Sequence, residues 1–461
     1  MLNARAAPTL TKLPRRLRSH SHTVQVQDPA ALTKPFINNL PLEILSKIFI
    51  LALPNDEEFI KGKKLRFLPP LPNPLSFCAV CSLWRTFALG TPQLWKRVFV
   101  YVPLGISGEE ARLKAACLIS WIERSATLSL TLFISYGMTT SLVELGPEAP
   151  IVHVLNRYAT RWEALYLQFA GTYSRTAPVF NSRLFSFDEW SSLQRIYSLR
   201  KYGGLGRDTA TPWGQLTHLE IKKPLLYRDA LNILKECAKL EWLSICAASS
   251  LSLPFEPPTR PIILHHVSFI SLTADAPCIS VIMQFICLPS LQDMSLQTPT
   301  PWQTPISLVP ILDFFTRSAC ALQKLRITAS RRQSKDLIRI LAHPSCNSLT
   351  SLTIDDYNFS DFGAVDDEVL QRLTLHQDGA LCTRLKSLTL ERCIPPCSFP
   401  TLLTMIESRI GSHAGQPRDG LLGYLNLEIK GVDNIEEKLD EIIKRSGNQH
   451  DGRKFVLHFH Q

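Results

Sequence analysis

The sequence predicts an α/β fold in which a small helical module precedes an irregular solenoid of short parallel strands and helices. Two observations predict it. Residues 36–100 contain two helical patterns rich in large apolar side chains, and from residue 193 onward one apolar pattern recurs every 24 to 37 residues. We therefore expect the helical module over residues 35–100, connecting helices and the first strand–helix units over 101–192, and the solenoid over 193–461.

The composition is typical of a folded protein in a reducing compartment. Hydrophobic residues make up 45% of the chain and charged residues only 20%, which is too apolar for a disordered protein. The 12 cysteines are too sparse for a disulfide scaffold, and most lie in apolar segments, where free thiols behave as small hydrophobes. No secretory segment or membrane span is predicted. We expect a cytoplasmic or nuclear protein with no membrane partner.

Residues 1–34 are basic and contain no acidic residue before Asp28. Pro8 and Pro14 interrupt any amphipathic helix there, so we expect a disordered, solvated tail. A mitochondrial presequence and a nuclear-import or nucleic-acid-binding tail remain the alternatives.

The first helical pattern begins at Pro41, which suits a first turn because its missing N–H would have no partner there. Glu43 suits the positive end of the helix dipole. The residues that then recur at helical spacing form one apolar stripe: Ile44, Leu45, Ile48 and Phe49.

The second helical pattern covers residues 73–90, with Asn73 as a cap and Gly90 at the end. We expect one helix here. Its apolar face contains Phe77, Val80, Cys81, Trp84 and Ala88.

These residues resemble the F-box, the module by which substrate receptors dock on the adaptor of SCF-type cullin–RING ubiquitin ligases. The resemblance rests on Leu40-Pro41, Glu43-Ile44-Leu45, Ile48-Phe49, Val80-Cys81, Trp84-Arg85, Ala88 and Thr91-Pro92-Gln93-Leu94-Trp95. The last group is most similar to F-box proteins expanded in mushroom-forming fungi. The resemblance implies that the adaptor, and through it cullin, binds Leu40, Pro41, Glu43, Ile44, Leu45, Ile48, Phe49, Val80, Cys81, Trp84 and Arg85. The chain departs from the family at residues 54–73, which add a charged, proline-rich loop between the helices.

The module carries more large apolar side chains than a helical unit of its size can bury alone. We therefore expect a partner to cover the remainder. The alternative is that the two helices belong to the core of a larger α domain.

After the module, residues 109–124 predict a helix, and residues 127–135 and 165–169 alternate like strands. From residue 193 the recurring unit is apolar-x-x-apolar-x-apolar, and it starts at Leu216, Leu240, Val267, Leu291, Leu322, Leu349, Leu385 and Leu422. Helical patterns follow at residues 229–237, 280–287, 334–341, 398–410 and 434–445. The units resemble leucine-rich repeats, which implies an arc with its strands on the inner wall. A compact α/β domain is the alternative, but it needs strands that are apolar on both faces, and polar residues fill the intervening positions here.

No catalytic, phosphate-binding or metal-binding motif is present, so we expect neither an enzyme nor a cofactor. The glycines of residues 203–206 predict a surface turn. Cys78 and Cys81 have metal-ligand spacing but no second pair, and we expect Cys81 to face the helical core. His265 and His266 are expected inside a strand, as a satisfied structural pair on alternate faces.

Two charge clusters occur one repeat apart. The acidic cluster contains Asp355, Asp356, Asp361, Asp366, Asp367 and Glu368, and the basic cluster contains Arg326, Arg331, Arg332, Lys335 and Arg339. Neighbouring repeats stack, so we expect the clusters to face one another, either as compensating edges or as a polar rim that steers a charged target. No aromatic residue interleaves the basic cluster, which disfavours nucleic-acid binding.

Together these features predict a non-catalytic substrate receptor that holds the ligase adaptor at one end and an unknown protein target on the repeat wall. Two other classes stay open. One is a scaffold that uses the adaptor contact without delivering targets for ubiquitin conjugation. The other is a recognition or defence protein whose wall binds a small ligand or a foreign peptide.

Overall fold

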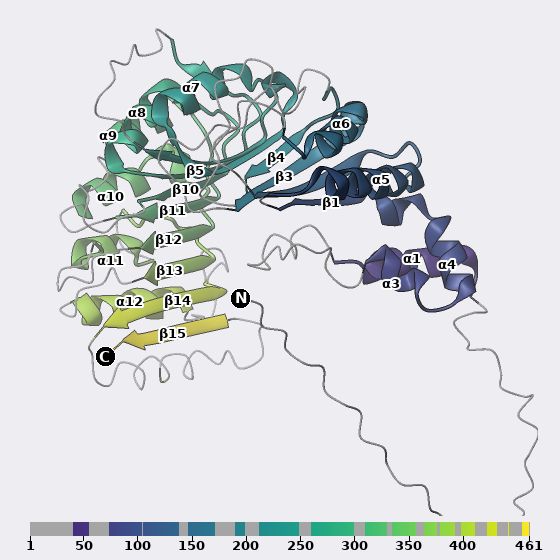
Figure 1. Ribbon diagram of the computed structural model, residues 1–461. Coiled ribbons are helices and arrows are strands. Elements are labelled where there is room, and N and C mark those ends of the chain that lie inside the picture. Colours follow the sequence, from purple (N-terminus) through teal and green to yellow (C-terminus); the bar gives the residue numbers. More distant parts are fainter. Residues whose placement is uncertain are drawn as a thin grey trace, which may run out of the picture.

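The computed structural model describes residues 40–54, 73–103, 105–137, 146–170, 190–198, 212–248, 260–298, 309–329, 334–355, 364–375, 379–391, 398–410, 422–430, 441 and 454–460. Within them, one thirteen-stranded sheet follows the order of the sequence, and each strand pairs in parallel with the next (Figure 1). Its strands are β1 (Arg97–Val102), β2 (Leu130–Gly137), β3 (Trp162–Ala170), β4 (Arg195–Ser198), β5 (His218–Leu226), β6 (Trp242–Ala248), β8 (Phe269–Ala274), β10 (Asp293–Gln297), β11 (Lys324–Thr328), β12 (Ser351–Asp355), β13 (Ser387–Glu391), β14 (Tyr424–Lys430) and β15 (Lys454–His460). Two short strands, β7 (Ile262–Ile263) and β9 (Ile286–Cys287), pair separately.

Helices connect successive strands and lie along the outer side of the curved sheet (Figure 1). They are α5 (Gly108–Arg124), α6 (Ala149–Arg157), α7 (Tyr227–Glu236), α8 (Ala276–Phe285), α9 (Val309–Ser318), α10 (Ser334–Leu341), α11 (Asp367–Leu373) and α12 (Phe399–Ile410). The shorter turns are η4 (Ala159–Arg161), η6 (Trp213–Gln215) and η7 (Pro344–Cys346). Among the described residues, the elements before β1 are α1 (Leu42–Ala52), α3 (Pro74–Cys78), α4 (Ser82–Leu89) and η3 (Pro92–Trp95).

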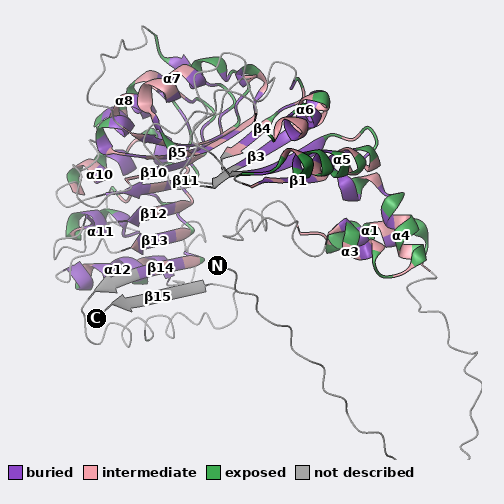
Figure 2. Cartoon of the chain, viewed as in Figure 1, coloured by how far each residue is buried: buried purple, intermediate pink, exposed green. Residues whose placement is uncertain are grey.

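The core is a continuous layer between the sheet and these helices. In all eight predicted repeats, the three apolar residues of the motif lie on a strand or at its entrance and are at most 3% exposed. They are buried because alternate side chains of a strand point to the same face, and that face meets the helices. Figure 2 shows the buried layer along the strands and the exposed outer faces of the helices.

Two tryptophans show that the unit also recurs before residue 193. Trp95 and Trp162 are both fully buried, and the same apolar spacing follows each of them: Trp95 lies just before β1, and Trp162 is the first residue of β3. Each indole N–H donates to a backbone carbonyl seven residues earlier, from Trp95 to Ala88 at 2.8 Å and from Trp162 to Leu155 at 2.9 Å. Each of these hydrogen bonds therefore ties the end of one helix to the start of the next strand.

Three arginines tie a unit to the one before it. Arg161 donates to the carbonyl of Leu128, and Arg317 donates to the carbonyl of Ile286. Arg409 is fully buried at the end of α12 and donates to carbonyls of the preceding unit. Because these carbonyls lie at helix ends and turns, they have no intrahelical donor, and the guanidinium supplies one.

Some expectations are wrong. The second helical pattern is two helices, because Cys81 has an extended backbone and its sulfur accepts a hydrogen bond from the Trp84 N–H at 3.5 Å. Cys81 is therefore a half-buried cap and not a core residue. His265 and His266 lie in an exposed turn before β8 and not inside a strand. Cys117, one of the cysteines expected to be buried in an apolar segment, is exposed on α5. The described residues do not include 1–34, 55–72, 203–206, 356–363, 330–333 or most of the helix predicted over 434–445, so the expectations for them stay untested.

Candidate functional site

The helices before β1 enclose a small aromatic core. Leu45 and Phe49 on α1 are each 1% exposed. The Phe49 ring stacks on Phe77 with centroids 4.4 Å apart and lies 4.8 Å from the ring of Trp84. Such contacts add to the free energy gained from burial alone. Leu45 and Phe49 therefore hold the module together, and half-buried Trp84 packs over them.

Hydrogen bonds between Asn73 and Ser76 fix the start of α3. The Asn73 side chain accepts from the N–H groups of Leu75 and Ser76 at 3.0 and 3.3 Å, and the Ser76 hydroxyl accepts from the Asn73 N–H. This reciprocal pair satisfies donors that the helix leaves open at its start. It holds the start of α3 at a defined point on the module.

Apolar side chains remain exposed on the outside of this closed core. On α1, Ile44, Ile48 and Leu51 follow one another at helical spacing and are 43%, 38% and 84% exposed. In the turn between α3 and α4, Val80 is 59% exposed. We call these, together with Leu42, Ile50, Leu75, Leu83 and Leu89, the exposed apolar set of the module. Such a concentration of exposed large apolar groups on so small a unit is typical of protein-interaction surfaces.

The other predicted partner-binding residues are polar or sit at the margin. Pro41, Glu43 and Arg85 are exposed, and Leu40 is half-buried. The Arg85 side chain donates from Nε to the carbonyl of Cys78 at 2.9 Å. Its guanidinium therefore stays close to the turn that presents Val80.

The module is fixed directly to the first strands of the sheet. The buried Trp95 ring meets Trp121 of α5 edge to face, with centroids 4.8 Å apart. Trp121 donates from Nε1 to the carbonyl of Arg97 at 2.9 Å, and Arg97 donates to the carbonyl of Pro54 at 2.7 Å. These contacts couple α1, η3, β1 and α5 at one junction.

The sheet face opposite the helices, called the inner face below, carries an aromatic ladder. Phe99, Phe133, Tyr166 and Tyr197 stand in register on β1 to β4, and neighbouring rings stack at 4.8, 4.4 and 4.4 Å. Farther along, Trp242 and Phe269 on β6 and β8 stack at 4.8 Å. The sequence analysis missed this ladder, although its signal is present: these rings occupy the positions between the buried apolar residues of each strand.

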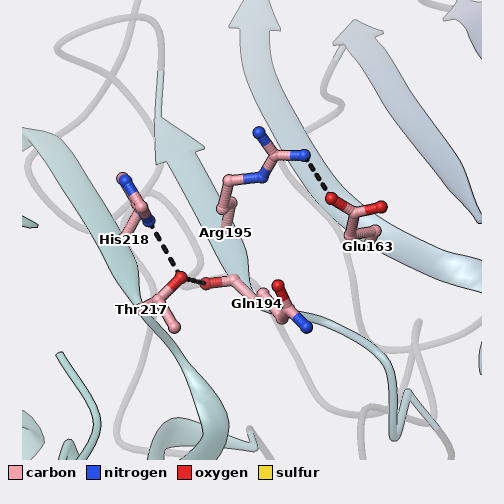
Figure 3. Close-up of polar contacts among 5 residues, drawn as sticks. All are labelled: Glu163, Gln194, Arg195, Thr217 and His218. Carbon is pink, nitrogen blue, oxygen red and sulfur yellow. Dashed lines mark hydrogen bonds and ion pairs between the residues drawn. The ribbon is translucent and has the colours of Figure 1, made fainter. Parts of the chain in front are cut away.

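A polar cluster lies where β3, β4 and β5 begin (Figure 3). Arg195 pairs with Glu163 at 2.5 Å, and the Thr217 hydroxyl lies 2.9 Å from Nδ1 of His218. Burial lowers the pKa of His218 below 6.5, the nearby Arg195 charge lowers it further, and Glu241 opposes them. The imidazole is therefore neutral at pH 7.

Arg326 and Asp355 bring the two predicted charge clusters into contact. Arg326 on β11 lies 4.0 Å from Asp355 on β12 and 3.7 Å from Glu391 on β13. Asp366 instead caps α11 by accepting from the Val369 N–H at 3.1 Å, and Arg339 pairs with Asp336 within α10. The expected face-to-face arrangement therefore applies to Arg326 and Asp355, which lie on the inner face.

An apolar cavity of about 660 Å³ lies between β1 and α5. Its lining includes Phe99, Tyr101, Leu113, Lys114, Cys117 and Trp121. Lys114 at its rim pairs with Glu110 at 3.0 Å and donates to the carbonyl of Tyr101 at 3.1 Å. The cavity thus adjoins the junction between module and sheet through Trp121.

Reactive chemistry is not prominent in the described residues. Burial raises the pKa of both the Cys237 and Cys382 thiols to about 12, so both stay protonated at neutral pH. Among the described side chains, no three His, Cys, Asp or Glu residues gather closely enough to hold a metal ion. No described helix is long and apolar enough to cross a membrane.

Residues 37–101 match the F-box-like family model. The matched segment covers the helical module and most of β1, and leaves the rest of the sheet outside it. No curated protein matches the chain.

Proposed function

We propose that this chain is a substrate receptor of an SCF-type cullin–RING ubiquitin ligase. In this proposal the helical module docks the adaptor, and the inner face of the sheet receives a protein target. The F-box-like match supports the adaptor half, because F-box domains bind SCF-type adaptors and through them cullin. The chain performs no bond chemistry in this role. It raises the local concentration of the target near a ubiquitin-loaded enzyme.

One observation supports the adaptor contact most directly. The module buries its own aromatic core but leaves the exposed apolar set accessible to solvent. Folding of the module does not require Ile44, Ile48 or Val80 to be apolar, since each stays at least 38% exposed. Burial of these side chains against a partner would stabilise the complex by roughly 25 cal/mol for each Å² of apolar surface removed from water.

The eleven residues predicted to bind the adaptor divide into two roles in this proposal. Ile44, Ile48 and Val80 contact it, with Pro41, Glu43 and Arg85 around them. Leu45, Phe49 and Trp84 hold the helices in the geometry that presents those contacts, as do Leu40 and Cys81 at the margins.

We further infer that the sheet is a leucine-rich-repeat-like solenoid that begins within the module and runs to the last strand. The sequential order of its parallel strands and the recurring buried motif support this assignment. The sequence Thr91-Pro92-Gln93-Leu94-Trp95, which forms η3 and the residue before it, supports the type of F-box protein expanded in mushroom-forming fungi.

Co-purification of the full chain with adaptor and cullin tests the proposal. Ile44→Asp and Val80→Asp should weaken adaptor binding at least about tenfold, because each buries a charge in the contact. Val309→Asp, at an equally exposed apolar position on α9, is the matched control and should bind normally. Circular dichroism checks that all three variants fold.

The outcomes separate the three classes of function. Adaptor and cullin in one complex support the receptor. Adaptor without cullin supports a scaffold, and binding of neither supports a recognition protein. Equal adaptor binding by wild type, Ile44→Asp and Val80→Asp contradicts the assigned docking residues.

A further inference from the structure

An elongated apolar cavity lies at the end of the sheet nearest the helical module. β1 is the terminal strand of the described sheet, and α5 lies alongside it (Figure 1). The terminal unit of a repeat array has no preceding unit to cover its core. The cavity of about 660 Å³ lies between these two elements, and its volume is typical of small-molecule sites.

Two hydrogen bonds fix the long axis of this cavity. The Lys114 ammonium donates to the Tyr101 carbonyl at 3.1 Å, and the Trp121 indole donates to the Arg97 carbonyl at 2.9 Å. β1 and α5 therefore run in opposite directions along the two sides of the cavity. The lining on α5 extends from Glu110 to Trp121, about 16 Å along the helix axis, which an extended hydrocarbon chain of roughly a dozen carbons spans.

The two ends of the cavity differ in polarity. Glu110 and Lys114 are the charged residues of the described lining, and both lie at the Tyr101 end. At the other end, the indole N–H of Trp121 is occupied by the Arg97 carbonyl, and its ring packs against Trp95. A ligand that matches this lining has a polar group at one end and an apolar body.

An added peptide strand fits this cavity less well than a hydrocarbon chain. A peptide carries N–H and C=O groups along its whole length, and burying them without partners costs free energy. The carbonyls of Arg97 and Tyr101 at the edge of β1 already accept from Trp121 and Lys114. They are therefore occupied as acceptors, whereas a hydrocarbon chain needs none.

Lys114 determines the charge of the polar group. An ammonium has three donors, and two of them are directed to Glu110 at 3.0 Å and to the Tyr101 carbonyl at 3.1 Å. The described residues provide no acceptor for the third. The ion pair with Glu110 is solvent-exposed, with side chains that are 34% and 48% exposed, so it is weak and an incoming carboxylate can compete with it.

The middle of the cavity exposes apolar surface to solvent. Leu113, on the lining, is 63% exposed, and Cys117 one turn further along α5 is also exposed. An apolar chain in the cavity would remove this surface from water, which favours binding.

We propose that the cavity binds a single-chain fatty acid, with its carboxylate at Lys114 and the end of its chain at Trp121. This inference goes beyond the proposed receptor function and does not depend on it. Because the Trp121 ring also contacts Trp95, the bound chain lies against the joint between module and sheet.

Isothermal titration calorimetry of the full chain with dodecanoate, below its micelle concentration, tests the site. Dodecanoate should bind with one site per chain, and at least about tenfold more tightly than octanoate, because its longer chain buries more apolar surface. Cys117→Trp fills the cavity and should weaken dodecanoate binding at least about tenfold. Ala116→Trp, at an exposed position on the same helix outside the lining, is the matched control and should bind normally.

A second variant tests the assignment of the carboxylate. Lys114→Met should weaken dodecanoate binding about two- to fivefold. Dodecyltrimethylammonium has the same chain with a cationic group, so it should bind wild type less tightly than dodecanoate and should not be weakened by Lys114→Met. Circular dichroism checks that all variants fold.

Three results would overturn the inference. Equal dodecanoate affinity of wild type and Cys117→Trp places the ligand outside this cavity. Tighter binding of dodecyltrimethylammonium than of dodecanoate contradicts the role of Lys114. Loss of dodecanoate binding in the complex with the adaptor assigns the cavity to the adaptor contact instead.

Discussion

The buried arginine at the end of α12 gives a sharp test of how the units are joined. Arg409 is fully buried and donates from Nε to the carbonyl of Leu373 at 2.5 Å, and from its terminal nitrogens to Leu381 and Cys382 at 3.0 and 3.3 Å. Burial lowers its pKa to about 10, so it remains charged at neutral pH and makes charge-assisted hydrogen bonds. The perturbation is Arg409→Met, which keeps a long side chain and removes every donor.

The expected cost follows from the carbonyls left behind. Cys382 keeps a second donor, the Leu385 N–H at 3.0 Å, whereas the described structure shows no other donor to the carbonyls of Leu373 and Leu381. A buried carbonyl without a donor costs about 1–3 kcal/mol. Relief from burying the guanidinium charge offsets part of this. Arg409→Met should therefore lower the free energy of unfolding by about 3 kcal/mol.

Urea denaturation followed by circular dichroism measures the total loss. A repeat array need not unfold in one step, so hydrogen exchange of residues 367–391 measures the local loss. Arg372→Met on the neighbouring helix is the control, because Arg372 is exposed and its contact with the Gly379 carbonyl is long, at 3.5 Å. If the two variants differ by less than about 0.5 kcal/mol, the guanidinium does not join these units.

Three further predictions concern other parts of the chain. The lowered pKa of His218 adds stability that is complete above pH 6.5 and is lost as the pH falls through the folded-state pKa; the urea midpoint should drop with falling pH, and less so in His218→Gln. A thiol reagent should modify exposed Cys117 well before Cys237, whose pKa burial raises to about 12; peptide mass spectrometry showing equal rates would contradict this. Trp84→Ala should destabilise the module by about 2–4 kcal/mol in thermal denaturation, since its half-buried ring packs on Phe49; an unchanged midpoint would refute this packing role.

Periodicity predicts the repeated strands well because it reports burial directly. Every motif leucine from Leu216 to Leu427 lies in the core, since a strand that meets helices on one face must place alternate side chains there. The earlier units were harder to find because tryptophan takes the first motif position in Trp95-x-x-Val98 and Trp162-x-x-Leu165.

Local chemistry and long-range contacts account for what the sequence did not predict. The break at Cys81 is a capping event, and helical periodicity cannot separate one helix of that length from two short ones in register. The stripe on α1 also divides, with Leu45 and Phe49 inside and Ile44 and Ile48 outside, because the helices it packs against cover only half of it. The aromatic ladder and the contact between Arg326 and Glu391 depend on strand register, which exists only once residues far apart in sequence pair.

A single residue, Lys96, separates η3 from β1, and Trp95, Trp121 and Arg97 lock that joint. In the proposed receptor, a target bound to the sheet therefore has a fixed orientation relative to the ligase. The position of each target lysine relative to the ligase then determines whether it is modified. A flexible glycine insert after Lys96 should therefore increase the number of target lysines that become modified, while binding of the adaptor and of the target is retained.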